Sequence, residues 1–317
     1  GGTAGAREYL RVESIDHHDI VLILYVLAPV SSIALLFAYW RRIGGRPGGA
    51  LRVAIVNLLV AAVAISSVVL CGELYFRFFY DTTDAFGRAN TARRWQERHY
   101  QLNALGMRDD RGGYRKPPVA GRPRVSFVGD SFAAGYGVAD VDLRFANRVR
   151  TARPDWEIHV LARNGWNTPD QIRFLENFPG RYRTDWMVLV YNLNDASDIG
   201  ARWQAMADEI YENDLPRYYL GQHGYFINWL HFRWIAATRD QANRYFALQS
   251  DAHGSGPMWR RQRERLRRVD ELARRAGGRL LVVTFPSLHA LGADYPYAPV
   301  HAALDAHWNA AGVPHLD

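Results

Sequence analysis

Two long apolar stretches stand near the start of the chain. The first runs from Ile20 to Trp40 without a charged residue, and the second from Val53 to Gly72 with Asn57 as its only strongly polar side chain. As α-helices rising about 1.5 Å per residue, both can cross the roughly 30 Å hydrocarbon core of a bilayer. Buried helices of a soluble protein are the other interpretation, but two uncharged stretches in succession favour membrane spans. We therefore predict an integral membrane protein with spans at 20–40 and 53–72.

The polar segments beside these stretches predict the orientation. The loop 41–52 contains no acidic residue and carries four arginines: Arg41, Arg42, Arg46 and Arg52. Short basic loops stay on the cytoplasmic side, so segment 1–19 and everything after the second span are expected on the periplasmic side of a bacterial inner membrane. A signal peptide is disfavoured because the first stretch is too long and lacks a small-residue cleavage site. Cys71 resembles a lipoprotein cysteine only loosely, since Leu70 stands where a small residue is required.

After a connecting segment at 73–123, the pattern changes to short apolar runs that alternate with helical segments. The β-branched content and spacing of these runs predict a parallel sheet covered on both faces, hence an α/β domain at 124–317. The expected strands are Val125–Val128, Trp156–Leu161, Trp186–Tyr191, Leu280–Thr284 and Val313–Leu316. Before the fourth strand, 258–276 predicts an amphipathic helix with Trp259, Leu266, Val269 and Leu272 on its buried face and arginines opposite.

An insertion at about 201–256 is longer than a crossover helix requires and rich in aromatic residues, above all at 225–237. A substrate lid, a membrane-surface helix, a partner contact and plain packing over the sheet all remain open for it.

Candidate chemistry follows the strands, because ligands of an open parallel sheet bind beyond the carboxyl ends of the strands. The first strand leads into Gly129-Asp130-Ser131, which would present a serine nucleophile on a tight turn. The second is followed by Gly165, within RNGWNT, and the third by Asn194, within YNLND. A glycine N–H and an asparagine amide from adjacent strands can stabilise an oxyanion beside the N–H of Ser131. Each piece alone is common turn chemistry.

Together, in this order, these pieces resemble the SGNH or GDSL hydrolases. The stretch VSFVGDSFAAGYGV is similar to the first block of that family, which implies Ser131 as nucleophile with Asp130 supporting it. By the same resemblance, Gly165 and Asn194 would complete the oxyanion hole. The implied fold is a three-layer α/β/α sandwich with strand order 2-1-3-4-5. One departure is Asn192, where the third block usually has glycine; a bulkier residue there would narrow the acyl pocket or change how Asn194 is held.

The family's catalytic histidine belongs to a DxxH block after the fifth strand. Here LDAHWNAAG offers Asp305 and His307 as a substitute, but the spacing is DxH, and residues two apart on a helix point to different sides. We favour a helix followed by the fifth strand for this segment. His289, His315 and Asp317 are weaker alternatives. The chain also begins without a methionine. If its ends are limits of processing, the true DxxH block would lie beyond Asp317.

Composition changes this interpretation little. The net charge is +7, and Lys116 is the only lysine among 39 basic residues, an arginine preference that gives no reason to expect nucleic-acid binding. Four of those charges lie in the loop 41–52, where they set topology. With a single cysteine and no metal-ligand cluster or cofactor motif, we expect neither metal nor cofactor.

Two functions remain open from the sequence. The first is a membrane-anchored esterase or O-acyltransferase that acts on an acylated envelope glycan or similar ester. The second is a non-catalytic subunit of a larger membrane protein complex, motivated by the missing histidine block, by Asn192 and by the aromatic residues around 225–234.

Overall fold

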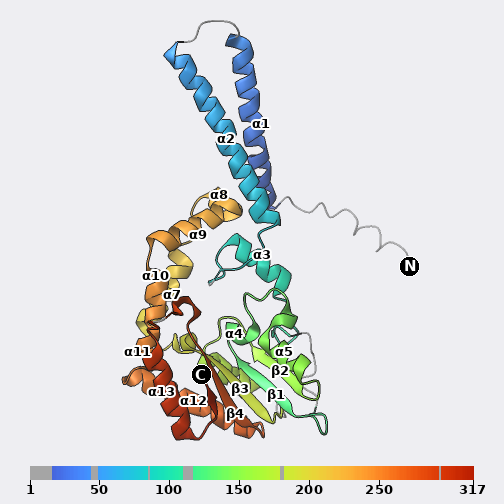
Figure 1. The fold of residues 1–317 in the computed structure, drawn as a ribbon, viewed down its shortest axis with the longest axis vertical. Coiled ribbons are helices and arrows are strands. Elements are labelled where there is room, and N and C mark those ends of the chain that lie inside the picture. The colour runs from blue at the N-terminus through green and yellow to red at the C-terminus, as the bar shows by residue number, and fades with distance from the viewer. Residues whose placement is uncertain (1–15, 44–48, 85, 110–116, 179–181, 293) are drawn as a thin grey trace, which may run out of the picture. The chain divides into compact units, whose positions relative to one another are not determined.

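The computed structural model describes residues 16–43, 49–84, 86–109, 117–178, 182–292 and 294–317, which form two compact units (Figure 1). The first unit joins residues 1–94 to Asp214–Ala237, and the second contains Trp95–Asn213 and Thr238–Asp317. The segment 201–256, expected as one insertion, is therefore divided between the two units.

Two long helices dominate the first unit. Helix α1 spans His17–Ile43 and α2 spans Ala50–Phe78, so both predicted apolar stretches are helical over their whole length (Figure 1). Both are long and apolar enough to cross a membrane. In the most apolar window of α2, no residue is buried against the described part of the chain, and in that of α1 only 17% are. A core helix would be mostly buried, so these helices are candidate membrane spans.

Parts of the predicted topology fall outside the described residues. These are 1–15 of the N-terminal segment, 44–48 of the basic loop with Arg46, and 110–116 of the connecting segment. Arg41 and Arg42 lie in the last turn of α1, and Arg52 lies in the first turn of α2. The described basic residues thus lie at the ends of the helices that flank the loop, while the side of the membrane stays a prediction.

Three further helices belong wholly or partly to the first unit. They are the start of α3 (Asn90–His99), α8 (Tyr219–His223) and α9 (Phe226–Thr238). The Asn90 amide donates to the backbone oxygens of Gln222 and Gly224, and the Asn228 side chain accepts from the Asn90 N–H. These buried bonds join α3 to the turn between α8 and α9.

The second unit contains a five-stranded, all-parallel sheet in the order β2-β1-β3-β4-β5. The strands are β1 (Arg124–Gly129), β2 (Glu157–Ala162), β3 (Trp186–Asn192), β4 (Arg279–Phe285) and β5 (His315–Leu316). The five predicted strands and their predicted order are confirmed. The last strand is shorter than expected because Pro314 has no N–H to donate, although its oxygen accepts from Val282.

Helices cover both faces of the sheet, which makes three layers. One apolar core contains Leu161, Leu189 and Val282 with side chains of α6 (Thr168–Asn177), α12 (Pro257–Arg275) and α13 (Ala298–Ala311). The other contains Phe127, Val160 and Val188 with side chains of α4 (Ser131–Ala134) and α5 (Phe145–Ala152). Neighbouring residues on β1 to β4 therefore enter opposite cores, as the period of a strand requires.

The inserted segment supplies four more helical elements to the second unit. They are α7 (Ala201–Asp208), a π-helical turn (Glu209–Asn213), α10 (Gln241–Ala247) and α11 (Gln249–His253). The predicted apolar face of α12 is buried, and the segment containing Asp305 and His307 is a helix, as expected.

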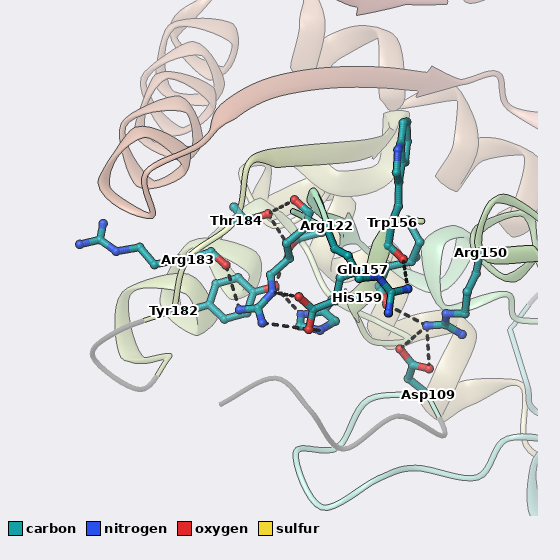
Figure 2. Close-up of polar contacts among 12 residues, drawn as sticks. Asp109, Arg122, Arg150, Trp156, Glu157, His159, Tyr182, Arg183 and Thr184 are labelled. Carbon is teal, nitrogen blue, oxygen red and sulfur yellow. Dashed lines mark hydrogen bonds and ion pairs between the residues drawn. The ribbon is translucent and has the colours of Figure 1, made fainter. Parts of the chain in front are cut away.

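A buried polar network ties the amino-terminal ends of β1 and β2 together (Figure 2). Arg124 donates through Nε and Nη2 to the two Glu157 carboxylate oxygens, both at 2.9 Å. His159 lies 3.4 Å from Glu157 through Nε2 and bonds Tyr182 through Nδ1 at 2.8 Å. Burial lowers the pKa of His159 to about 4, so this histidine is neutral at pH 7. The network lies at the sheet edge opposite the carboxyl ends of the strands and is structural.

Candidate active site

The segments that follow β1, β2 and β3 leave the sheet at one edge. Gly129, the last residue of β1, is level with Ala162 at the end of β2 and with Val190 near the end of β3. Because parallel strands end at the same edge, the three blocks predicted from the sequence start beside one another.

The Gly129-Asp130-Ser131 turn has no room for a larger first residue. A Cβ on Gly129 would lie 2.8 Å from both the Ala133 Cβ and the Val190 oxygen. Asp130 caps α4 by accepting the Phe132 N–H at 2.9 Å. Ser131 is the first residue of α4, is partly exposed, and its hydroxyl donates to Asp130 Oδ2 at 3.4 Å. The strand-to-helix turn therefore presents a serine hydroxyl at the sheet edge.

Two buried aspartates share this edge. Burial raises the pKa of Asp130 to about 6. The pKa of Asp195, just after β3, is raised well above its usual value, first by burial and then by the charge of Asp130. Two carboxylates that disfavour each other's ionisation retain a proton to higher pH than exposed aspartates would. The edge thus carries less negative charge at neutral pH than its two acids imply.

Gly165 lies in the loop between β2 and α6. Its φ of +80° is in the left-handed region, and no atom lies within 4 Å of the place where a Cβ would stand. The backbone conformation, rather than crowding, therefore explains the glycine. The neighbouring Asn164 N–H donates to the Tyr100 hydroxyl at 3.1 Å, and Asn167 with Asp170 forms a capping box that starts α6. These contacts fix the loop that carries the Gly165 N–H.

Asn194 lies in a short 3-10 helix, Leu193–Ala196, directly after β3. The side chain of Asn192 caps this helix by accepting the Asn194 N–H at 3.2 Å. The unexpected asparagine at 192 therefore supports the turn that carries Asn194. The Asn194 Oδ1 is buried without a hydrogen-bond partner among the described residues. The Asn194 side chain therefore has hydrogen-bonding capacity that the described residues do not use.

Side chains that the sequence analysis missed join the second and third blocks. Ser197 Oγ donates to Asn167 Oδ1 at 3.0 Å, and Thr168 Oγ1 donates to the backbone oxygen of Asp195 at 3.3 Å. Gln171 Nε2 donates to the Asp195 carboxylate at 3.3 Å. Thr168 and Gln171 are fully buried. The sequence offered one signal for these partners: α6 follows a buried strand and carries polar residues near its start.

A chain of buried hydrogen bonds continues behind these loops. Gln262 Nε2 donates to Thr168 Oγ1 at 2.8 Å and to the Tyr191 hydroxyl at 3.1 Å. The Tyr191 hydroxyl bonds His253 Nε2 at 2.7 Å, and His253 Nδ1 bonds the backbone oxygen of Gln249 at 2.7 Å. Because a carbonyl oxygen only accepts, His253 Nδ1 holds the proton and Nε2 accepts from Tyr191. The chain supports β3 immediately before the Asn192–Asp195 turn.

This arrangement predicts a pH dependence of stability. Burial lowers the pKa of His253 to about 4, against about 6.5 in an unfolded chain. Between these values the unfolded chain binds the extra proton, so stability is present above pH 6.5 and is lost as pH falls towards 4. We expect this histidine to account for about 3 kcal/mol between pH 7 and pH 4. Urea unfolding of the α/β unit at both pH values, in wild type and His253→Gln, measures it.

The variant should lose less stability than wild type on acidification. Equal losses in the two proteins would contradict the assignment, because His159 and His307 also have a pKa near 4 and would then account for the whole effect.

Asp305 and His307 are not brought together. Asp305 accepts from Asn309 at 3.0 Å and lies 3.3 Å from His315 Nδ1. The His307 ring instead contacts Trp259, with ring centroids 5.9 Å apart, and its Nε2 is buried without a partner among the described residues. Burial and nearby arginines lower its pKa to about 4. As the helical spacing indicated, the two side chains point to different neighbours.

The other histidines considered from the sequence have separate partners. His289 stacks on Phe246 with centroids 4.1 Å apart, and His315 Nε2 bonds Thr284 Oγ1 at 2.8 Å. Asp317 pairs with His301 at 2.5 Å. Among the described residues, the Ser131 hydroxyl bonds the Asp130 carboxylate and no histidine.

A pocket of about 530 Å³ opens beside the last two strands. Its lining residues are Pro286, Tyr295, Ala298, His301, Ala302, Asp305 and Asp317. Ser131, Gly165 and Asn194 are not among them, so this pocket is separate from the three blocks.

Comparison with known proteins finds no match to a protein-family profile and none to a curated protein. Within the described ranges, no group of three or more histidine, cysteine, aspartate or glutamate side chains is arranged to hold a metal ion.

Proposed function

We propose that the protein is a membrane-anchored serine esterase or O-acyltransferase of the SGNH type, with Ser131 as nucleophile. The observation that carries this proposal is the shared sheet edge at which the Ser131 turn, the Gly165 loop and the Asn194 turn begin.

In the proposed reaction, Ser131 Oγ attacks the carbonyl carbon of an ester while a base takes the hydroxyl proton. The carbonyl oxygen becomes an oxyanion that accepts hydrogen bonds from the N–H groups of Ser131 and Gly165 and from Asn194 Nδ2. When this tetrahedral intermediate collapses, the ester bond breaks and the acyl group stays on Ser131. The alcohol leaves with the proton that the base had taken. Water then releases the acyl group as an acid, or an acceptor hydroxyl carries it away as a new ester.

The base is the part of the mechanism that the described contacts do not supply. Strand β5 is parallel to β1, so residues that follow Leu316 in a longer chain would emerge at the edge where Ser131 lies. A histidine carried there could receive the Ser131 proton, as in the family's fourth block.

The candidate spans support a substrate close to a membrane. We propose an acylated envelope glycan or a similar ester, met on the periplasmic side of a bacterial inner membrane. The arginines at the adjoining ends of α1 and α2 favour this orientation.

A non-catalytic subunit of a membrane complex is the second candidate. The absence of a histidine on the Ser131 hydroxyl, among the described residues, favours it. The two functions differ in whether Ser131 reacts as a nucleophile.

A fluorophosphonate probe on the full chain in mild detergent tests the proposal. We expect Ser131 to be labelled, as identified by mass spectrometry of the modified peptide. In Asn194→Ala the labelling rate should fall about 10²-fold, because the phosphonyl oxygen loses one donor. Its unfolding free energy should not fall, since the Asn194 Oδ1 makes no hydrogen bond with the described residues.

Asn177→Ala is the matched control, because that exposed amide bonds the Arg173 backbone oxygen of its own helix and, among the described residues, no side chain. Labelling should be as fast in this variant as in wild type. No labelling of wild type, combined with stable co-migration with another protein, would instead support the accessory subunit.

A further inference from the structure

Helix α9 has two faces of different character. The inner face buries Asn228, Phe232 and Ile235. The outer face, defined here as Leu230, Arg233, Trp234 and Ala237, repeats every three or four residues and is exposed. Trp234 is 59% exposed and Leu230 is 40% exposed, although both are large apolar side chains. This is an amphipathic helix whose outer apolar side chains are exposed.

The start of α9 is fixed to α2. The Glu73 carboxylate accepts the N–H groups of Tyr225, at 2.8 Å, and Phe226, at 2.9 Å, and so caps α9. The Phe226 ring lies against Gly72, where a Cβ would approach it to 2.6 Å. Gly72 is also where the apolar stretch of α2 ends. Helix α9 therefore begins at the level at which α2 would leave the hydrocarbon core.

The preceding helix, α8, is fixed to the start of α1. His17 Nδ1 bonds the Tyr219 hydroxyl at 3.1 Å, and the His17 ring stacks on His223 with centroids 4.7 Å apart. His18 Nδ1 bonds the His223 oxygen at 2.5 Å. Helices α8 and α9 thus lie beside the ends of the candidate spans that carry His17 and Glu73 (Figure 1).

We propose that the outer face of α9 binds the interfacial region of the lipid bilayer that α1 and α2 cross. Tryptophan and arginine are suited to this region because one part of each side chain is apolar and another is polar. The adjoining end of α2 also exposes Tyr75 and Phe78, and Phe79, which follows it, is exposed as well. The span therefore ends in exposed aromatic side chains. Asp214 is the only acidic residue between 214 and 237, and it is buried against Arg88. The segment therefore presents no exposed carboxylate to anionic lipid.

This inference rests on the candidate spans and is independent of the proposed chemistry at Ser131. A second protein or a second copy of this chain could also cover an apolar helix face. The bilayer is favoured because Glu73 and Gly72 fix the start of α9 at the end of a span.

Site-directed spin labelling of the full chain in vesicles tests the inference. In a Cys71→Ser background, nitroxide is attached to Trp234→Cys or to Leu230→Cys, and the protein is reconstituted in phosphatidylcholine and phosphatidylglycerol at 3:1. Val60→Cys, exposed on α2, marks the hydrocarbon, and Arg267→Cys, exposed on α12, marks water. Collision with oxygen, which enters lipid, and with a water-soluble nickel chelate gives the depth of each label.

Both α9 labels should favour oxygen and lie about 5 to 10 Å below the headgroup boundary, between the two reference labels. Nickel accessibility equal to that of the label at 267 would overturn the inference while leaving the spans intact. Shielding from both reagents would also overturn it, because protein rather than lipid would then cover the face. A label at 60 outside the hydrocarbon would refute the spans and the inference together.

Discussion

Replacing Ser131 with alanine should reduce hydrolysis of a simple ester, such as p-nitrophenyl acetate, by roughly 10³-fold or more. The hydroxyl is the only atom at this edge proposed to bond covalently to the acyl group, so no other donor replaces it. Stability should change little, because the side chain is partly exposed and its bond to Asp130 is long, at 3.4 Å. Steady-state kinetics of the purified full chain, together with urea unfolding, measures both quantities.

Ser126→Ala, on the preceding strand β1, is the matched control. Ser126 is buried and bonds Tyr182 and Thr184, so this variant should lose about 1 to 2 kcal/mol of stability but keep its activity. Retained ester hydrolysis in Ser131→Ala would exclude Ser131 as the nucleophile. Wild-type protein inactive on esters would favour the accessory function.

Replacing Arg108 with alanine should lower the unfolding free energy by about 3 kcal/mol or more. Arg108 is almost fully buried and donates to the backbone oxygens of His99, Gly135 and Val138, at 2.5 to 2.8 Å for the shortest bond to each. Without the guanidinium, these oxygens lose a charged donor in a place that water reaches poorly. The segment that Arg108 holds follows α4 directly, so labelling at Ser131 should also slow.

Arg173→Ala supplies the comparison for Arg108. Its side chain is 71% exposed and pairs with Asp170 at 3.3 Å, so its removal should cost at most about 0.5 kcal/mol. Arg108→Lys should fall between the two, because an ammonium keeps the charge but cannot reach all three oxygens in the geometry of the fork. Equal urea midpoints for Arg108→Ala and Arg173→Ala would show that the buried network is not stabilising.

The strands and the helix at 298–311 could be predicted because their signals are local. The apolar runs of β1 and β3 are visible within six or seven consecutive residues. The 3.6-residue period of α12 is likewise visible within a single segment. The Ser131 turn was recognisable for the same reason, since Gly129-Asp130-Ser131 directly follows the first strand in the sequence. The capping role of Asn192 was not recognisable from the sequence. A capping side chain is identified only once the backbone N–H that donates to it is known.

The polar partners behind the site could not be predicted. Gln262 lies 94 residues from Thr168 and 71 from Tyr191, and nothing in the local pattern of α12 indicates that its one buried glutamine faces them. The same holds for Asp305, whose sequence neighbour His307 faces Trp259 while the more distant His315 approaches it. Pairings of this kind depend on how whole elements pack.

By itself, the sequence determined two candidate spans, the α/β class, and the positions of Ser131, Gly165 and Asn194 at strand ends, because each follows from the period or turn chemistry of a short segment. Only the tertiary structure decided that 214–237 belongs with the N-terminal helices. Glu73 and Tyr225 are 152 residues apart, and a carboxylate on one helix caps another only once both have been brought together by packing. Local sequence patterns specify helices and strands, whereas the hydrogen-bond partners of buried polar groups are fixed only when these elements pack.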